Sequence, residues 1–114
     1  MREFDWYSNE SRDTMRNWGE DVRIDLGRQI RDVQSGGFPA GAKWWKDVAP
    51  GVIQLKSKGF RTIITIAVED VVVVVHAFEK DSAKGSGTRK QHKEIVRRRV
   101  SDLLERMGKQ KRKH

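Results

Sequence analysis

The chain has 114 residues, with no cysteine and only two prolines. The lack of cysteine excludes disulfide bonds and thiolate chemistry. The longest apolar run begins at Val71 and is interrupted by His76, far short of the roughly 20 residues that a membrane-spanning helix needs. The first residues, Met1 to Asp5, are too charged for a signal peptide. We therefore expect a cytoplasmic protein without a membrane segment.

The motifs of several common enzyme classes are also missing. The sequence contains no Gly-rich phosphate loop of the Walker type and no serine nucleophile elbow. Its histidines, His76, His92 and His114, are scattered rather than paired at the spacing of metal ligands. We therefore expect neither a metal ion nor a cofactor.

Positive charge, by contrast, is abundant and concentrated near the C-terminus. Residues 1–84 contain 13 Lys/Arg and 13 Asp/Glu, whereas residues 85–114 contain 11 Lys/Arg and three acidic residues. The last segment thus accounts for the whole net charge of +8. Such asymmetry indicates a polyanionic or acidic partner. The alternative is a solvated basic helix followed by a disordered tail.

Hydrophobic periodicity predicts one α+β domain over residues 1–108, followed by a basic, disordered tail at 109–114. The apolar residues of segment 20–34 recur every three or four positions, as in a helix that packs one face on a sheet. Segment 71–78 is apolar on both faces, as in a covered central strand. We expect an antiparallel twisted sheet packed against N-terminal helices and a C-terminal helix. The expected elements are strand 4–7, helices 12–18 and 20–34, strands 51–56, 60–68 and 71–78, and helix 88–107.

Two adjacent tryptophans, Trp44 and Trp45, lie in the predicted loop 38–50. Neighbouring side chains of an extended chain point to opposite sides. One ring is therefore expected in the core and the other half exposed. The exposed ring either stacks on a nucleic-acid base or closes the edge of the core.

Basic residues recur at the ends of the predicted strands. In an antiparallel meander, the end of strand 51–56 and the end of strand 71–78 both flank the start of strand 60–68. Cations gathered at one place repel each other unless an anion is bound there, and phosphate is the natural anion. We therefore expect a concave anion site lined by Lys56, Lys58, Arg61, Lys80 and Lys84, with Arg61 near the surface.

An ordered set of motifs resembles the phage-related, HigB-like toxins of the RelE/ParE superfamily. The residues that carry the resemblance are Gly51-Val-Ile-Gln-Leu-Lys56, Phe60-Arg61-Thr-Ile-Ile-Thr65, Val74-Val-His-Ala-Phe-Glu-Lys80, Thr88-Arg-Lys-Gln-His-Lys-Glu-Ile95 and Arg97-Arg-Arg99. The N-terminal helical pair and Gly36-Gly37 also match, so the resemblance extends over residues 4 to about 107.

The resemblance implies the toxin of a type II toxin–antitoxin pair. Such a toxin is a metal-independent endoribonuclease that cleaves mRNA, typically on the ribosome, by attack of a ribose 2′-hydroxyl on the adjacent phosphate. Arg61, Lys80 and Lys56 match basic positions of the family motifs and are implied as catalytic residues. We expect Lys58, Lys84, His92, Arg97 and Arg98 to bind RNA or support the site.

Some family features are absent from this sequence, and their absence leaves the general base and the general acid unassigned. Phe60 replaces a tyrosine of the family pattern, and Asp81 stands where a second lysine is common. His92, Glu79 and Lys84 are the candidates for general base and acid. His76, within the apolar strand, is expected to be a hydrogen-bonded core histidine.

The competing interpretations are a ParE-like DNA gyrase poison and a non-catalytic RNA-binding or degenerate toxin. A gyrase poison needs no catalytic residues, so the Arg61 and Lys80 pairing favours the ribonuclease. The expected antitoxin is a small helix-turn-helix protein. We expect it to cover either the cationic site or a surface made by helix 20–34 and the last helix.

Overall fold

The computed structural model describes residues 1–80 and 88–112. They form an α+β fold with the predicted order of elements and one additional short strand, β2. The elements are β1 (Glu3–Trp6), α1 (Asn9–Arg16), α2 (Glu20–Gln34), β2 (Lys43–Trp44), β3 (Val52–Ser57), β4 (Phe60–Thr65), β5 (Val71–Glu79) and α3 (Thr88–Arg112).

The strands form one five-stranded sheet in the order β1-β5-β4-β3-β2. Strands β2 to β5 pair antiparallel, as their short connections require. Strand β1 pairs parallel with β5, so the sheet is mixed rather than antiparallel throughout. The two strands are far apart in the chain, since α1, α2 and the strands β2 to β4 lie between them, and such a long connection permits parallel pairing.

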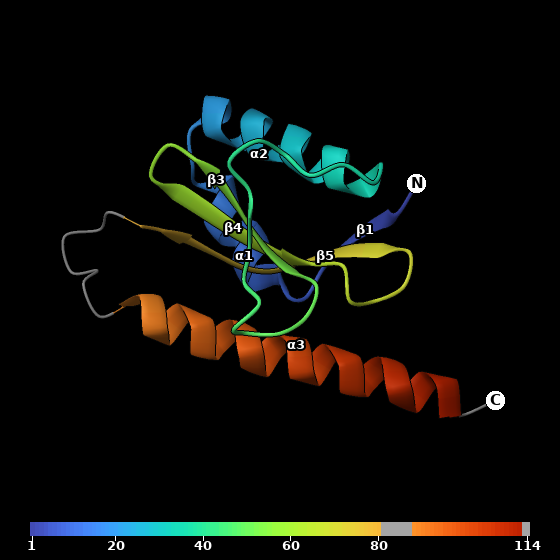
Figure 1. The fold of residues 1–114 in the computed structure, drawn as a ribbon. Coiled ribbons are helices and arrows are strands. Elements are labelled where there is room, and N and C mark those ends of the chain that lie inside the picture. The colour runs from blue at the N-terminus through green and yellow to red at the C-terminus, as the bar shows by residue number, and fades with distance from the viewer. Residues whose placement is uncertain (81–87, 113–114) are drawn as a thin grey trace.

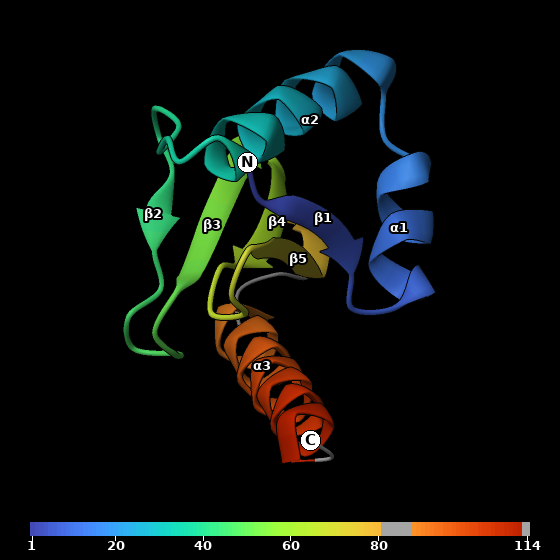
Figure 2. The same cartoon turned by 90° about the vertical axis from the view of Figure 1, so that its right-hand side faces the viewer.

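Helices cover both faces of the sheet (Figures 1 and 2). Helices α1 and α2 bury residues such as Met15 and Leu26 against one face, in a cluster that includes Ile64 and Val74. Helix α3 buries Val96 and Val100 on the other face, in a second cluster. A strand covered on both sides is apolar at successive positions, which explains the run of valines in β5.

The placement of α2 and α3 corrects one prediction. These helices lie on opposite faces of the sheet, so they do not form the shared surface that we expected an antitoxin to cover (Figure 2). Helix α3 also extends to Arg112 rather than ending near Met107, so that residues 109–112 continue the helix. The boundary between a domain at 1–108 and a tail stays a prediction.

The predicted difference between the two adjacent tryptophans is confirmed. Trp45 is 2% exposed and packs in the cluster under α3, whereas Trp44 is 43% exposed. Trp44 stacks on Phe38, with ring centroids 5.2 Å apart. Among the described residues, none of the helices has the length and apolar character that crossing a membrane requires.

Candidate functional site

The antiparallel strands bring three predicted site residues to one end of the sheet. Lys56 of β3 pairs with Arg61 of β4, and Arg61 pairs with Phe78 of β5. Lys80 follows β5, and its backbone N–H donates to the carbonyl oxygen of Gly59 at 2.8 Å. The predicted convergence of the strand ends on the start of β4 is therefore present.

A β-bulge decides which face of β5 carries the site. Ile63 pairs with His76, but Ile64 pairs with Val74, so Val75 is an extra residue on β5. Before the bulge, the odd-numbered residue Val73 faces α3. After the bulge the alternation is reversed: Ala77 packs on the side of α1 and α2, and its neighbours His76 and Phe78 face α3. The bulge thus turns the end of β5 so that Lys80 lines the same cavity as Phe78.

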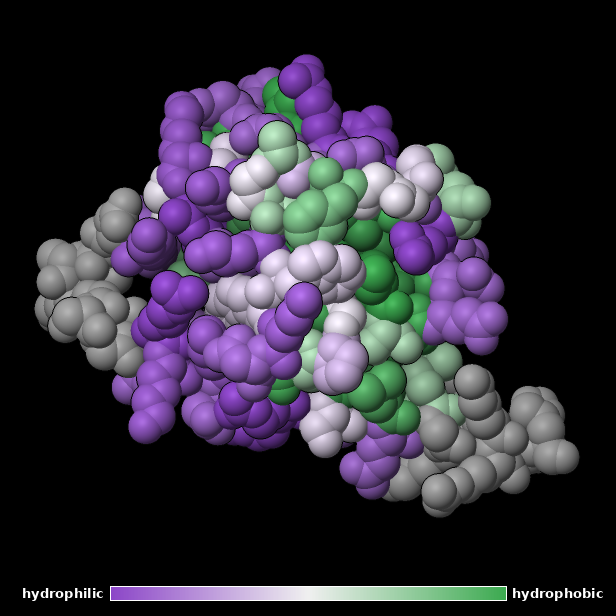
Figure 3. Space-filling model, in the orientation of Figure 1, coloured by the Kyte–Doolittle hydropathy of each residue, from purple (hydrophilic) through white to green (hydrophobic). Residues whose placement is uncertain are grey.

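The cavity on this α3 face has a volume of about 210 Å³. Its charged lining is entirely cationic, because the described residues around it include no aspartate or glutamate. The basic residues that line it are Lys43, Lys56, Arg61, Lys80 and Arg89, and they are joined by His92. In Figure 3, hydrophilic residues cover the side of the molecule where β3 and β5 end and α3 begins. Such a cavity suits an anion.

Arg61 is more buried than we expected. The prediction that it lies near the surface is wrong, because the residue is only 8% exposed. Its Nη1 donates to the carbonyl oxygens of Lys58 at 2.7 Å and Phe60 at 3.1 Å. The guanidinium makes no other hydrogen bond to a described residue, so Nε and Nη2 remain as donors for a ligand. Arg61 is thus held rigidly at the base of the cavity.

Lys56 and Lys80 are exposed at the cavity, unlike Arg61. The stem of Lys56 passes close to Gly41, where an added Cβ would lie 3.0 Å from the lysine Cε. Gly41 has a φ of +82°, a conformation that glycine adopts without strain. The loop before β2 therefore favours a glycine here for its backbone, while the flexible end of Lys56 can move aside.

His92 lines the cavity from α3 and contacts two residues of β5. Its ring stacks on Phe78 at 3.8 Å, and its Nδ1 lies 2.7 Å from Nε2 of His76. His76 is 6% exposed, and its burial is the main reason that its pKa falls to about 4. Burial also lowers the pKa of His92. The expectation that His76 is a hydrogen-bonded core histidine is confirmed.

One other predicted residue of the site lies elsewhere, and a second is not described. Lys58 has a φ of +54° in the turn after β3 and pairs with Asp21 of α2, outside the cavity. Lys84 lies outside the described residues. The RNA-binding role expected for Lys58 thus has no support from its position, because its ammonium is occupied by a carboxylate.

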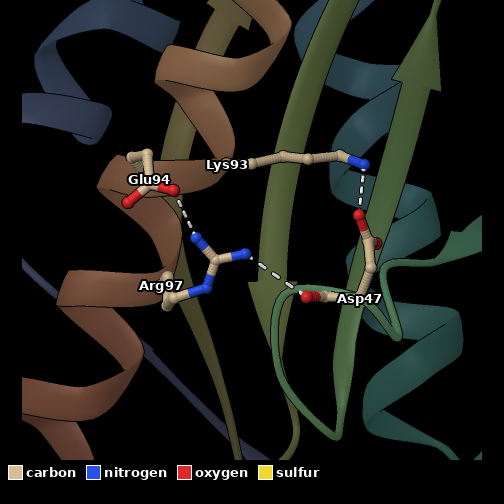
Figure 4. A network of polar contacts seen from close by, with 4 residues as sticks. All are labelled: Asp47, Lys93, Glu94 and Arg97. Carbon is tan, nitrogen blue, oxygen red and sulfur yellow. Dashed lines mark hydrogen bonds and ion pairs between the residues drawn. The ribbon is translucent and has the colours of Figure 1, made fainter.

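The predicted arginines of α3 also lie outside the cavity. Arg97 contacts Glu94 at 2.5 Å and the carbonyl oxygen of Asp47 at 3.3 Å, while Lys93 contacts the Asp47 carboxylate at 2.5 Å (Figure 4). This network ties α3 to the loop between β2 and β3. Arg98 is exposed on α3 and lines the same surface groove as Arg97. Their part in RNA binding stays a prediction.

Sequence reasoning missed two cations of the cavity and the role of Arg99. Lys43 reaches the cavity because β2 pairs it with Gln54, and Arg89 lies in the first turn of α3. Arg99 donates to the Val75 carbonyl at 2.7 Å and to Glu10 at 2.8 Å, so it joins α3 to the bulge and to α1. The short strand β2 left no periodic signal from which the place of Lys43 could have been predicted.

Within residues 1–80 and 88–112, no cluster of three or more His, Asp or Glu side chains is arranged to hold a metal ion. The arrangement can bind a phosphate group by cations from β3, β4 and α3 and from the residue after β5. It can also stabilise negative charge that develops on the oxygens of that phosphate.

Comparisons with known proteins place this fold in a family. Residues 13–101 match the family described as Phage derived protein Gp49-like (DUF891). The isolated E. coli RelE toxin is similar in structure, with a TM-score of 0.59 and 17% identity over 81% of this chain and 98% of that chain. A mutant of the E. coli toxin RelE in the free state is also similar, with a TM-score of 0.53 and 21% identity over 75% of this chain and 90% of that chain. No curated protein matches the chain. The chain therefore belongs to the phage-derived Gp49-like family and has the fold of the RelE toxins.

Proposed function

We propose that this protein is the toxin of a type II toxin–antitoxin pair and that it cleaves mRNA as a metal-independent endoribonuclease of the HigB-like branch. The observation that carries the proposal is the cavity whose charged lining is wholly cationic, with Arg61 fixed at its base. The likeness to the E. coli RelE toxin supports it. The exposed basic part of α3 is consistent with action on the ribosome.

The chemistry follows from the needs of RNA cleavage. The ribose 2′-hydroxyl releases its proton to water, its oxygen bonds to the adjacent phosphorus, and the bond from phosphorus to the 5′-oxygen breaks. The products are a 2′,3′-cyclic phosphate and a free 5′-hydroxyl. Negative charge builds on the non-bridging oxygens in between. Nε and Nη2 of Arg61 would bind these oxygens. The ammonium groups of Lys56 and Lys80 would neutralise their charge, and the Lys80 ammonium would supply the proton to the leaving 5′-oxygen.

The antitoxin, which we propose is a small helix-turn-helix protein, has a second surface available. An apolar groove of about 450 Å³ lies on the other face of the sheet, beside the unpaired edge of β1, with Phe4 and Trp6 in its lining. Arg16 and Arg23 line it too, and neither pairs with an acidic group among the described residues. We propose that an acidic amphipathic segment of the antitoxin binds there. Opposite charge would speed its association.

The deciding experiment compares two lysines of one hairpin. Lys56→Gln removes a cation from the cavity, whereas Lys58→Gln removes one that is paired with Asp21 outside it. In primer extension on mRNA from induced cells, we expect loss of cleavage for Lys56→Gln and unchanged cleavage for Lys58→Gln. Cleavage should persist with a chelator and vanish when the attacking 2′-hydroxyl is replaced by hydrogen.

Other results would contradict the proposal. Equal activity of the two variants would exclude the cavity as the active site. Inhibition of supercoiling by purified gyrase, with intact mRNA, would instead support the ParE-like alternative. Induction without growth arrest or cleavage would support a degenerate, RNA-binding protein.

A further inference from the structure

Of the three residues that the sequence left open as general base or acid, one is a described residue of the cavity. Glu79 pairs with Phe60, whose ring packs on the α1/α2 side of the sheet, so Glu79 lies on the face opposite the cavity. Lys84 lies outside the described residues. Among the described candidates, His92 lines the cavity with Arg61 and Glu79 does not. Its chemistry therefore depends on which of its nitrogens carries the proton.

We propose that His76 holds His92 as a neutral imidazole with its proton on Nε2, so that His92 is a hydrogen-bond donor to a phosphate oxygen in the cavity. The inference deepens the proposed ribonuclease function and rests on it for the identity of the phosphate. His92 is then a binding group for the reacting phosphate rather than the general base. His76, which does not line the cavity, is a positioning residue.

The contact between the two rings leaves only two arrangements of protons when both are neutral. One ring must donate across the 2.7 Å between Nε2 of His76 and Nδ1 of His92. If His76 donates from Nε2, its Nδ1 is an acceptor and His92 carries its own proton on Nε2. If His92 donates from Nδ1, the proton of His76 is on its Nδ1 and Nε2 of His92 is bare.

The surroundings of His76 favour the first arrangement. Its Nδ1 is buried and has no hydrogen-bond partner among the described residues. A buried N–H without an acceptor is rarer and more costly than a buried acceptor without a donor. The cation of Arg99, which binds the neighbouring Val75 carbonyl, disfavours a second proton on His76, so the ring stays neutral and only these two arrangements compete.

The cavity keeps His92 neutral as well. The ring of His92 is partly buried against Phe78, and this burial disfavours its charged form and lowers its pKa. The charged groups that line the same cavity, Arg61, Lys80 and Arg89 among them, are all cations. From β5, His76 faces the ring of His92, and the carboxylate of Glu10, which acts on His76, is paired with Arg99. A neutral donor adds a hydrogen bond to phosphate without adding to the repulsion among the cations.

The test is ¹⁵N NMR of the histidine rings in the full chain, titrated with inorganic phosphate. At pH 7 we expect protons on Nε2 of both His76 and His92, and a shift of the His92 Nε2 signal as phosphate binds. The Lys58→Gln control should respond as wild type. His76→Phe, which keeps an aromatic ring in the strand, should allow His92 to exchange between tautomers and weaken its response to phosphate.

Kinetics separate this inference from the proposed function. His92→Phe should lower kcat/KM for RNA cleavage by about a hundredfold, as loss of one donor to a developing oxyanion does, and His92→Gln should retain more activity. A proton on Nδ1 of His92, a charged His92 at pH 7, or phosphate that leaves its Nε2 signal unmoved would overturn the inference. The expected NMR results without any RNA cleavage would instead contradict the ribonuclease while the phosphate donor stands.

Discussion

Replacing Arg61 tests whether the guanidinium is structural as well as functional. Arg61 is 8% exposed, and its Nη1 binds the carbonyl oxygens of Lys58 and Phe60. Arg61→Ala deletes both charge-assisted hydrogen bonds, each worth about 1.5–3 kcal/mol. Water entering the open cavity replaces part of this loss. We therefore expect the free energy of unfolding to fall by about 2–3 kcal/mol.

The assay is thermal and urea unfolding of the purified variants. At about 4 °C per kcal/mol for a domain of this size, Arg61→Ala should lower Tm by roughly 8–12 °C. Arg61→Lys keeps one donor and the buried stem, so we expect about half that decrease together with a large loss of cleavage. Arg98→Ala, an exposed control on α3, should change stability by less than about 0.5 kcal/mol. An unchanged Tm for Arg61→Ala would show that the two carbonyl contacts contribute nothing to folding, and the proposed rigidity of the site would be wrong.

Three further predictions concern other parts of the molecule. Folding lowers the pKa of His76 from 6.5 to about 4, so the neutral ring contributes its full stabilisation above pH 6.5 and loses it as the pH falls toward 4. In urea unfolding at a series of pH values, His76→Phe should therefore lose less stability over this range than the wild type. Tyr7→Phe removes the 2.6 Å hydrogen bond to Asp102 that joins the end of β1 to α3, and calorimetry should detect a loss of about 1 kcal/mol. Removing residues 109–114 should leave cleavage intact but make RNA binding less dependent on salt. The slope of log K against log salt concentration should fall by about 0.7 for each phosphate that the shortened chain no longer binds. An unchanged slope would mean that this segment does not contact RNA.

The sequence by itself was enough to predict the order of the main elements, because their apolar periodicities are local. Segment 20–34 shows a helical repeat, and the valines of 71–78 indicate a strand covered on both faces. Short connections between the last three strands also implied antiparallel pairing. That pairing is why the sequence alone predicts Lys56 and Arg61 side by side, as the register of β3 and β4 confirms.

Burial and partner choice in the site required the tertiary structure. The pattern of charges in the sequence does not reveal that Arg61 is buried and binds two backbone carbonyls, or that Lys58 pairs with Asp21 of α2. The same is true of Arg97 and Arg99, which read as basic surface yet contact Asp47 and Val75. A charged side chain finds its partner through contacts that are distant in sequence, and periodicity carries no information about them.

The β-bulge shows most clearly what only the tertiary structure decided. Strict alternation along β5 would place Lys80 and His76 on the face of α1 and α2, since Val74 faces that way. One extra residue at Val75 reverses the alternation and brings both residues to the α3 side. The bulge is stabilised by a hydrogen bond from Arg99, a residue 24 positions away. Side chains of a strand alternate between its two faces, so one inserted residue moves every later side chain to the other face. This insertion leaves no local signal in the sequence, yet the cationic cavity and the histidine pair depend on it.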